Sequence, residues 1–597
     1  MNQIPLTIPS LRKVYQNGTT PAEIIEQVFN KIDEVNDPGI FITLFDKDAL
    51  LEDAKQLGEF DPSKPLWGVP FAIKDNIDAE GYETTAACPA YAYTPEEDAF
   101  LVKELKKAGA LLIGKTNLDQ FATGLVGVRT PYGAPLNSID PKIVPGGSSG
   151  GSGVAVGHGI VSFSLGTDTA GSGRVPAALN NIVGLKPTLG AFSASGVVPA
   201  CRSIETVSIF ALTVEDAYTA FEVANSYDPD DAYAREIALR PLTQPKSDLV
   251  VGIPSQSSIK FMGDKAQEAS FYDSVDVLKS QGYTIIEIDF EPFYEIANML
   301  YYGSWVAERY TVIEDLLEKD PNAILPVTKK IITLAESRSA ADAFKGFYKL
   351  KELSRLVEPQ LDAVDILCVP SIPTFYSVDD LENDPITPNN NFGTYTNFVN
   401  LMDMCGIAVP TPSRSDGRPG SVTLLAPKGE DALVASVGLS IEAEGARNLG
   451  ATDWAFSSSV ELAETAKDTI TIAVCGAHMD GLPLNKDLLS RGACFAEKVA
   501  SAPDYKFYAL AGGPPYRPGM VRCEAGQGVE VEMELWELPI SQFGSFMQTI
   551  PSPLGIGTLK LSDGRAVKGF ICEAEGVKDA EDISEMKSWR RYLDQRS

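Results

Sequence analysis

The sequence between about residues 95 and 450 alternates amphipathic helix patterns with short apolar strands, and this alternation constrains the fold more than any other feature. A helix pattern precedes an apolar strand in three places: 100–108 before 111–113, 269–278 before 284–288, and 341–361 before 366–369. Such alternation is typical of parallel strands whose sheet is covered by helices. We therefore predict an α/β fold with a mostly parallel mixed sheet covered by helices.

The pattern changes after about residue 455. Small, Ser-rich and then Glu-, Ala- and Lys-rich residues at 456–469 predict a linker. Further along, apolar side chains alternate with glutamates at the period of a half-exposed strand. The apolar positions are Val529, Val531, Met533 and Leu535. We therefore expect a large domain over residues 1–455 and a smaller, antiparallel, strand-rich domain over residues 470–597.

Charge and cysteine usage narrow the class of protein. The formal net charge is −31, which disfavours binding to nucleic acid or to an anionic membrane surface. Neither a run of 18 apolar residues nor a secretory signal pattern is found, so we expect a cytoplasmic protein. Eight scattered cysteines without a Cys-x-x-Cys pair fit a reducing compartment. The two histidines are too few for most transition-metal sites, and we expect no metal.

Residues 109–116 match the Gly-x-x-x-x-Gly-Lys-Thr pattern of phosphate-binding loops. That loop needs a strand before its glycines and a helix after them. Here a helix pattern comes before, and the central residues are themselves the apolar strand. We therefore interpret the segment as the end of a strand and predict no nucleotide site.

Residues 146–150 match the Gly-x-Ser-x-Gly pattern of the nucleophile elbow of α/β hydrolases. The elbow needs a strand directly before it and a triad histidine downstream. Two prolines within residues 141–145 disfavour that strand, and the available histidines are His158, ten residues on, and His478, in the second domain. We do not predict a Ser-His-Asp triad.

Four other blocks occur together in the first domain. Residues 68–76 form an apolar strand that ends in Lys74, residues 145–153 are rich in glycine and serine, and residues 166–177 lead into a helix expected near Val175. The fourth is Gly-Leu-Lys-Pro-Thr at 184–188. In this order, and with Ser148 and Ser172 24 residues apart, they resemble the amidase signature family.

The resemblance implies a catalytic Lys-Ser-Ser set. Ser172 would be the nucleophile, and Ser148, after a cis peptide bond to Gly147, would carry a proton from Ser172 to Lys74. Lys74 can accept that proton only if burial holds it neutral. The expected oxyanion hole is formed by the backbone amides of Thr169, Ala170, Gly171 and Ser172. Asp168 and Arg174 are expected to brace this loop.

The family usually has glycine at position 170 and a β-branched residue at position 173. This chain has Ala170 and Gly173 instead. The difference narrows the subfamily, and the catalytic residues are unaffected.

Residues 300–310 resemble allophanate hydrolases within that family. The segment predicts a helix on which Tyr301 and Arg309 share a face. The resemblance assigns both to binding the carboxylate and carbonyl groups of a small substrate, which suits the two-pronged guanidinium. Without the resemblance, an ion pair between Arg309 and Glu308 or another acid is the plainer interpretation.

Three C-terminal segments, 474–485, 512–519 and 553–558, are similar to the domain appended to allophanate hydrolases. That domain resembles the γ-glutamyl cyclotransferase fold. Its implied task is to decarboxylate N-carboxycarbamate, with His478 as the catalytic imidazole, and Tyr516 and Arg517 are candidates for binding the anion. A lone histidine in such a position is otherwise more often structural.

The resemblance thus predicts an amidohydrolase that converts allophanate to ammonia and carbon dioxide without a metal or organic cofactor. It implies a homodimer in urea degradation, coupled to urea carboxylase as a separate protein or in a fusion. One alternative is hydrolysis of another small amide, or a glutaminase-type transamidation subunit, with a structural second domain. A scaffold without activity would require a broken Lys-Ser-Ser set, and all three residues are present.

Overall fold

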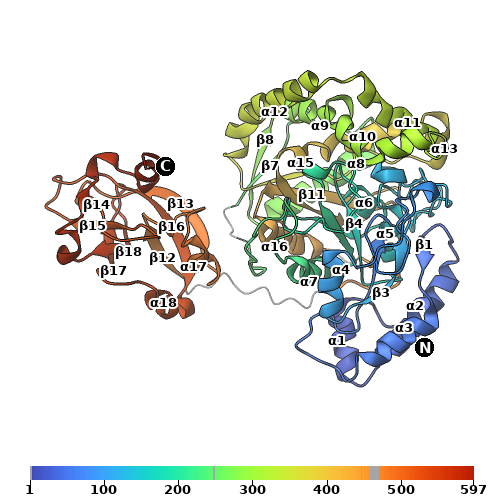
Figure 1. Cartoon of the computed structure of the whole chain (residues 1–597), viewed down its shortest axis with the longest axis horizontal. Helices are drawn as coiled ribbons and strands as arrows, with labels where there is room; N and C mark the ends of the chain where they lie inside the picture. The colour runs from blue at the N-terminus through green and yellow to red at the C-terminus, as the bar shows by residue number, and fades with distance from the viewer. Residues whose placement is uncertain (1–2, 246–248, 445–446, 458–468, 597) are drawn as a thin grey trace. The chain divides into compact units, whose positions relative to one another are not determined.

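The computed structural model of the chain describes residues 3–245, 249–444, 447–457 and 469–596. It divides into two compact units (Figure 1). Unit 1 comprises Met1–Ile237 and Pro245–Glu461, and unit 2 comprises Ala238–Gln244 and Leu462–Ser597. The predicted linker at 456–469 falls mostly on residues 458–468, which lie outside the described residues. Each unit is described by itself below.

Unit 1 is built from a large sheet and the helices around it. Its strands are β1 (Phe41–Leu44), β2 (Pro70–Lys74), β3 (Leu111–Thr116), β4 (Phe163–Thr167), β5 (Val183–Lys186), β6 (Val207–Ala211), β7 (Val250–Pro254), β8 (Thr284–Ile288), β9 (Ile366–Pro370), β10 (Met404–Thr411) and β11 (Gly420–Pro427). Its helices are α1 (Ile8–Gln16), α2 (Pro21–Val35), α3 (Lys47–Gln56), α4 (Phe100–Lys107), α5 (Gly150–Gly157), α6 (Val175–Leu179), α7 (Val214–Ala224), α8 (Lys265–Ser280), α9 (Glu291–Tyr302), α10 (Trp305–Lys319), α11 (Pro326–Ile332), α12 (Ala340–Leu361), α13 (Val378–Asn383), α14 (Thr387–Phe392), α15 (Phe398–Leu401) and α16 (Asp431–Glu442).

The sheet has eleven strands in the order β1-β3-β2-β4-β6-β5-β10-β11-β9-β7-β8. An α/β unit with a large mixed sheet covered by helices is therefore confirmed. The expected majority of parallel pairs is wrong. Of the ten pairings among the described strands, four are parallel, around β2 and β7, and six are antiparallel.

Connection length explains the antiparallel centre of the sheet. β10 and β11 are joined by residues 412–419, too short for a helical crossover, and such a link can join only antiparallel neighbours. The helix–strand alternation read from the sequence belongs to α4–β3, α8–β8 and α12–β9. It is absent from the strands in between.

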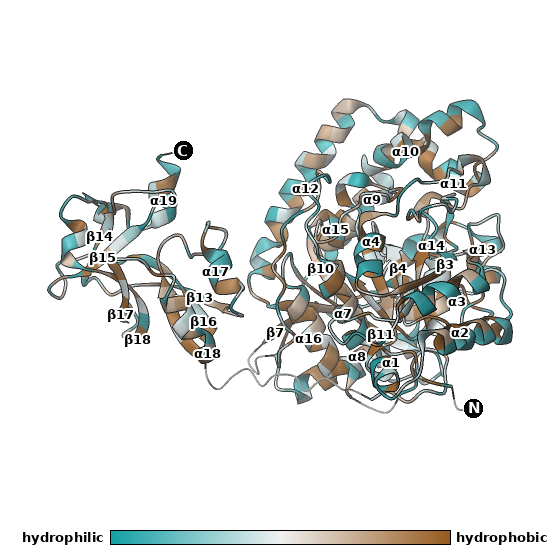
Figure 2. Ribbon diagram, turned by 60° about the horizontal axis from the view of Figure 1, so that its bottom comes forward, coloured by the Kyte–Doolittle hydropathy of each residue, from teal (hydrophilic) through white to brown (hydrophobic). Residues whose placement is uncertain are grey.

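The core lies on both faces of this sheet. Every residue of β2 to β6 is buried, as expected for strands covered from both sides. In Figure 2 hydrophobic strands occupy the interior of unit 1, and the outer helices carry hydrophilic residues on their exposed faces. The segment with the phosphate-loop pattern is β3, paired with β1 and β2, which confirms its interpretation as a strand.

The predicted helix over 300–310 is two helices. α9 ends at Tyr302, Gly303 is extended (φ −94°, ψ −158°), and α10 begins at Trp305. A Cβ at Gly303 would lie 2.3 Å from the carbonyl oxygen of Met299, so the chain can turn this closely only at a glycine. Tyr301 and Arg309 therefore do not share one helical face.

Unit 2 is smaller and rich in strands. Its strands are β12 (Thr469–Val474), β13 (Cys494–Ala500), β14 (Tyr505–Ala509), β15 (Pro518–Arg522), β16 (Glu532–Pro539), β17 (Leu554–Lys560), β18 (Ala566–Cys572) and β19 (Glu581–Asp582), with helices α17 (Asn485–Leu489), α18 (Ile540–Met547) and α19 (Trp589–Asp594). They form a five-stranded sheet, β13-β16-β12-β18-β17, and a three-stranded sheet, β15-β14-β19. All these pairings except β12–β18 are antiparallel.

One detail of unit 2 departs from the alternating pattern. The strand begins at Glu532, not at Val529, and Glu534 is buried. Its carboxylate accepts hydrogen bonds from the amide of Asp480 and from Arg590, which compensates for burying the charge. The resemblance of unit 2 to the γ-glutamyl cyclotransferase fold stays a prediction. Across both units, no helix of the described ranges is long and apolar enough to cross a bilayer.

Candidate active site

Two neighbouring parallel strands present their carboxyl ends at one edge of the sheet in unit 1. Lys74 is the last residue of β2, and Thr167 is the last residue of β4. Ser148 lies just before α5, and Ser172 lies in the loop between β4 and α6. The carboxyl ends of parallel strands are where α/β proteins most often place functional groups.

Three side chains form a continuous line of contacts at this edge. The Nζ atom of Lys74 lies 2.8 Å from the Oγ atom of Ser148, which lies 2.9 Å from the Oγ atom of Ser172. Lys74 also donates to the hydroxyl of Thr167 at 2.7 Å. The Gly147–Ser148 peptide bond is cis, as expected. The arrangement allows a proton to move from Ser172 through Ser148 to Lys74.

Lys74 is completely buried, and its surroundings shift its protonation. Burial lowers the pKa of Lys74 from its ordinary 10.5 to about 8. Nearby carboxylates, those of Glu205, Asp119 and Asp168, oppose this shift, and the charge of Arg309 adds to it. A lysine with this pKa is partly uncharged near neutral pH, and the uncharged amine can accept a proton.

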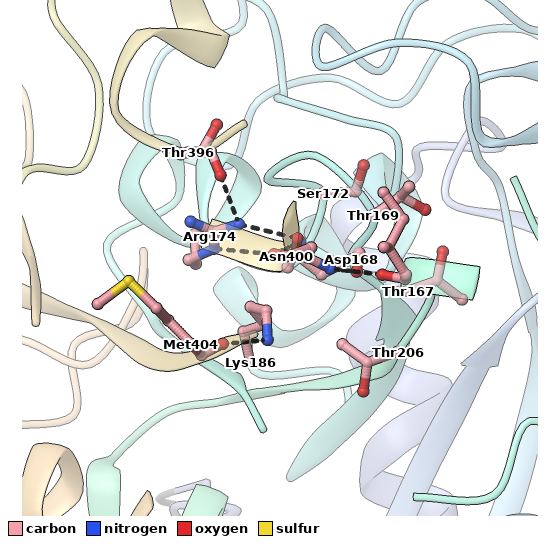
Figure 3. Close-up of polar contacts among 12 residues, drawn as sticks. Thr167, Asp168, Thr169, Ser172, Arg174, Lys186, Thr206, Thr396, Asn400 and Met404 are labelled. Atoms are coloured by element: carbon pink, nitrogen blue, oxygen red, sulfur yellow. Dashed lines mark hydrogen bonds and ion pairs between the residues drawn. The ribbon is translucent and has the colours of Figure 1, made fainter. Parts of the chain in front are cut away.

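The loop between β4 and α6 is held by a buried ion pair (Figure 3). Arg174 donates from Nε and Nη2 to the two carboxylate oxygens of Asp168, each at 2.9 Å, and both side chains are fully buried. The amide of Gly173 also donates to Asp168. Asn400 of α15 donates to the carbonyl oxygens of Asp168 and Ile204. The expected brace by Asp168 and Arg174 is thus present in the geometry.

The backbone amides of this loop point to an open function. Among the described residues, none of the amides of Thr169, Ala170, Gly171 and Ser172 donates a hydrogen bond. Buried amides are normally paired, so four consecutive unpaired N–H groups beside a serine hydroxyl form a site for a developing negative charge.

Tyr301 and Arg309 meet although they lie on different helices. The guanidinium carbon of Arg309 lies 5.2 Å from the centre of the Tyr301 ring. Arg309 is 2% exposed, and its two hydrogen bonds, to the carbonyl of Ala122 and the hydroxyl of Thr123, are each 3.3 Å long. Its Nε and Nη2 atoms and the Tyr301 hydroxyl have no hydrogen-bond partner in the described chain.

The plainer interpretation of Arg309, an ion pair with Glu308, is wrong. Glu308 points elsewhere and accepts hydrogen bonds from the amide and hydroxyl of Ser203. Arg309 is therefore a buried cation with unsatisfied donors, which costs free energy unless an anion binds. Its charge also reaches Lys74, so the two belong to one electrostatic environment.

His478 lies in unit 2, in the turn that follows β12. It lines a cavity of about 110 Å³ together with Asp487, Arg517 and Phe570. The Nε2 atom of His478 has no hydrogen-bond partner in the described residues and lies 3.9 Å from the Oδ2 atom of Asp487. Tyr516, by contrast, is 49% exposed.

The protonation of His478 differs from the ordinary case. Burial lowers the pKa of His478 to about 4, Asp487 opposes the shift, and Arg517 and Arg491 add to it. The expectation that an ordinary pKa near 6.5 makes this imidazole a proton donor at neutral pH is therefore wrong for this structure. His478 is neutral at that pH, and it can donate a proton only if a bound anion restores its charge.

Three polar residues of the site were not selected from the sequence. Thr167 lies within a quoted motif, but a threonine at a strand end carries no signal of its own. Glu205 and Asn400 belong to segments remote in sequence from the serines, and only the fold brings them to the loop. No group of three or more His, Cys, Asp and Glu side chains is placed to hold a metal ion in the part of the chain that is described.

The family model described as amidase matches residues 23–435. The chain belongs to the amidase family. A second family model, the allophanate hydrolase C-terminal domain, matches residues 470–594. Both matches agree with the two resemblances recognised from the motifs.

Similar proteins carry both parts. A solved structure of Kluyveromyces lactis allophanate hydrolase is 40% identical, has a TM-score of 0.74, and is covered to 99% by 99% of this chain. The urea amidolyase of Saccharomyces cerevisiae is 42% identical over 574 residues, which are 93% of this chain and 31% of the relative. The chain thus spans about a third of the length of that urea amidolyase and of the one from Lachancea kluyveri.

Other relatives match a smaller share of this chain. A subunit of the glutamyl-tRNA(Gln) amidotransferase of Listeria monocytogenes is 31% identical over 468 residues, 72% of this chain and 95% of the relative. The second family model is the feature that separates this chain from an amidase-family relative of that length.

The buried pair of Asp168 and Arg174 generates a stability prediction. Arg174→Met should lower the free energy of unfolding by about 3–5 kcal/mol, because it leaves the Asp168 carboxylate buried without its partner. The control is Arg235→Met, which removes an exposed pair with Asp403 and should cost less than about 1 kcal/mol. Urea unfolding of the full chain measures both. Equal shifts for the two variants would contradict the buried brace.

Proposed function

We propose that this chain is an allophanate hydrolase. The observation that carries the proposal is the buried, unpaired guanidinium of Arg309 beside the Lys74–Ser148–Ser172 line. An amide with a carboxylate a few atoms away suits such a pair of sites, because the carboxylate neutralises Arg309 while the carbonyl meets Ser172. The 40% identity to an allophanate hydrolase over nearly the whole chain supports this substrate.

In the proposed first step, Ser172 attacks the terminal carbonyl of allophanate. Ser148 passes the proton of Ser172 to the neutral amine of Lys74, and the amides of residues 169–172 stabilise the tetrahedral oxyanion. The proton returns through Ser148 to the leaving nitrogen, which departs as ammonia. Water then cleaves the acyl-enzyme by the same relay, and N-carboxycarbamate is released.

In the proposed second step, unit 2 promotes loss of carbon dioxide from N-carboxycarbamate. The product of step one is a dianion, and its entry beside His478 would raise the pKa of the imidazole. Arg517, in the same cavity, would bind a carboxylate. The protonated imidazole would then deliver a proton to the nitrogen as the C–N bond to the departing carboxylate breaks.

The wider assignments rest on the same resemblance. We propose residues 1–455 and 470–597 as the two functional domains, a homodimer, and a cytoplasmic place in urea degradation. The match to a third of a urea amidolyase supports coupling to a urea carboxylase, in the same chain or in a separate one.

The role of Ser172 can be tested directly. Ser172→Ala should lower ammonia release from allophanate by at least about a thousandfold, because the nucleophile is lost and the small site keeps its fold. Ser152→Ala is the matched control: Ser152 is also buried nearby but bonds to the carbonyl of Leu165 and should keep most of the activity. An active Ser172→Ala protein would refute the assignment.

Substrate binding by Arg309 gives a second test. Arg309→Lys keeps the charge and loses the two-pronged geometry, so the KM for allophanate should rise about tenfold or more. Hydrolysis of malonamide, a neutral diamide, should change little. Arg338→Lys, an exposed change that affects a bond to the carbonyl of Tyr302, is the control. An unchanged KM for allophanate would reduce Arg309 to a structural residue.

The division of labour between the units gives a third test. His478→Ala should release the first ammonia at the normal rate and delay carbon dioxide, since only the second step needs the imidazole. His158→Ala, which removes the other histidine of the chain, should leave both products unaffected. Stopped-flow detection of ammonia and carbon dioxide follows the two steps together. Normal carbon dioxide release by His478→Ala would place the chemistry of unit 2 elsewhere.

A further inference from the structure

Glu205 is a buried acidic residue beside the loop of unpaired amides. It follows a short 3-10 helix, η3 (Arg202–Ile204), and its side chain is 7% exposed. One carboxylate oxygen, Oε2, accepts hydrogen bonds from the hydroxyl of Thr169 at 2.7 Å and from the amide of Ala200 at 2.6 Å. The other, Oε1, is buried and has no partner in the described part of the chain.

The charged groups around Glu205 lie on several elements. Lys74 at the end of β2 and Arg309 on α10 both lower the pKa of Glu205, as do its two hydrogen bonds, whereas burial is the largest influence and raises it. Asp119 and Asp168 act on Lys74 in the same direction as Glu205 does. Two donors and two cations favour the ionised carboxylate, in which Oε1 can only accept hydrogen bonds.

The unpaired atoms around the site are complementary to one kind of molecule. Arg309 and Tyr301 offer free donors, and Glu205 offers a free acceptor. A ligand that satisfies all three presents a carboxylate and, next to it, an N–H group. Allophanate has such a group, because a nitrogen bridges its amide carbonyl and its carboxylate. Malonamate has the same length and charge with a methylene in that place.

We propose that Glu205 is a specificity-determining residue whose Oε1 accepts a hydrogen bond from the bridging N–H of the substrate. The inference rests on the proposed function and adds the reason for preferring an N-carboxylated amide over its carbon analogue. A site built to bind an N–H group rejects an analogue without one, because its own acceptor is then left buried and unpaired.

The test compares kcat/KM for allophanate and malonamate in the full chain. Glu205→Gln keeps an oxygen for Thr169 and Ala200 but presents an amide N–H₂ to the substrate, so the fold is retained and the acceptor is lost. The preference for allophanate over malonamate should fall by about tenfold or more relative to the unmodified chain. Taking the ratio of the two preferences cancels the different intrinsic reactivities of the two amides.

Glu308→Gln is the matched control. It removes a carboxylate next to Arg309 that is bonded to Ser203, and the preference should stay the same. A chain without activity on allophanate would refute the proposed function, whereas an active chain whose preference survives Glu205→Gln would refute the role of Glu205 alone.

A binding measurement covers the case in which Glu205→Gln is inactive on both amides. Calorimetric titration of the Ser172→Ala chain and of the Ser172→Ala/Glu205→Gln chain with allophanate and malonamate gives the same ratio without turnover. Loss of the preference in the double variant supports the proposal. Equal preference in the two chains overturns it.

Discussion

Burial of Lys74 is the constraint on which the rest of this site depends. An amine at the end of a strand in water would be protonated and useless as a base. Here β2 and β4 bring Lys74 and Thr167 together, and burial lowers the pKa of Lys74 to about 8. The neighbouring carboxylates limit this shift and Arg309 adds to it. Charges that serve substrate binding therefore also set the state of the base.

The loop from Asp168 to Arg174 depends on support from outside itself. Its ion pair is internal, but Asn400 on α15 bonds the Asp168 and Ile204 carbonyls, and Arg174 also reaches the carbonyl of Thr396. These contacts hold the four amides without occupying them. The site is thus preorganised, and stabilisation of a developing charge requires little rearrangement at the moment of reaction.

Sequence reasoning located what is encoded locally. Lys74, Ser148 and Ser172 lie in short motifs whose composition reflects their backbone, and the helices before β3, β8 and β9 follow from apolar periodicity. It misjudged what depends on distant contacts: the antiparallel centre of the sheet, the break at Gly303, the burial of Glu534 and the pKa of His478. Glu205 was missed for the same reason, because a lone glutamate shows its role only beside Thr169.

Direct titration of the Lys74 amine tests the central claim most simply. Nuclear magnetic resonance of chains labelled at the lysine side chain, recorded between pH 6 and 11, gives one curve per resolved lysine. The signal absent from a Lys74→Met variant identifies this residue, and the buried Lys115 and Lys186 remain visible in both samples. The account predicts a midpoint near pH 8. A midpoint at the ordinary value near 10.5 would mean a fully protonated Lys74 at neutral pH and would contradict its role as the base.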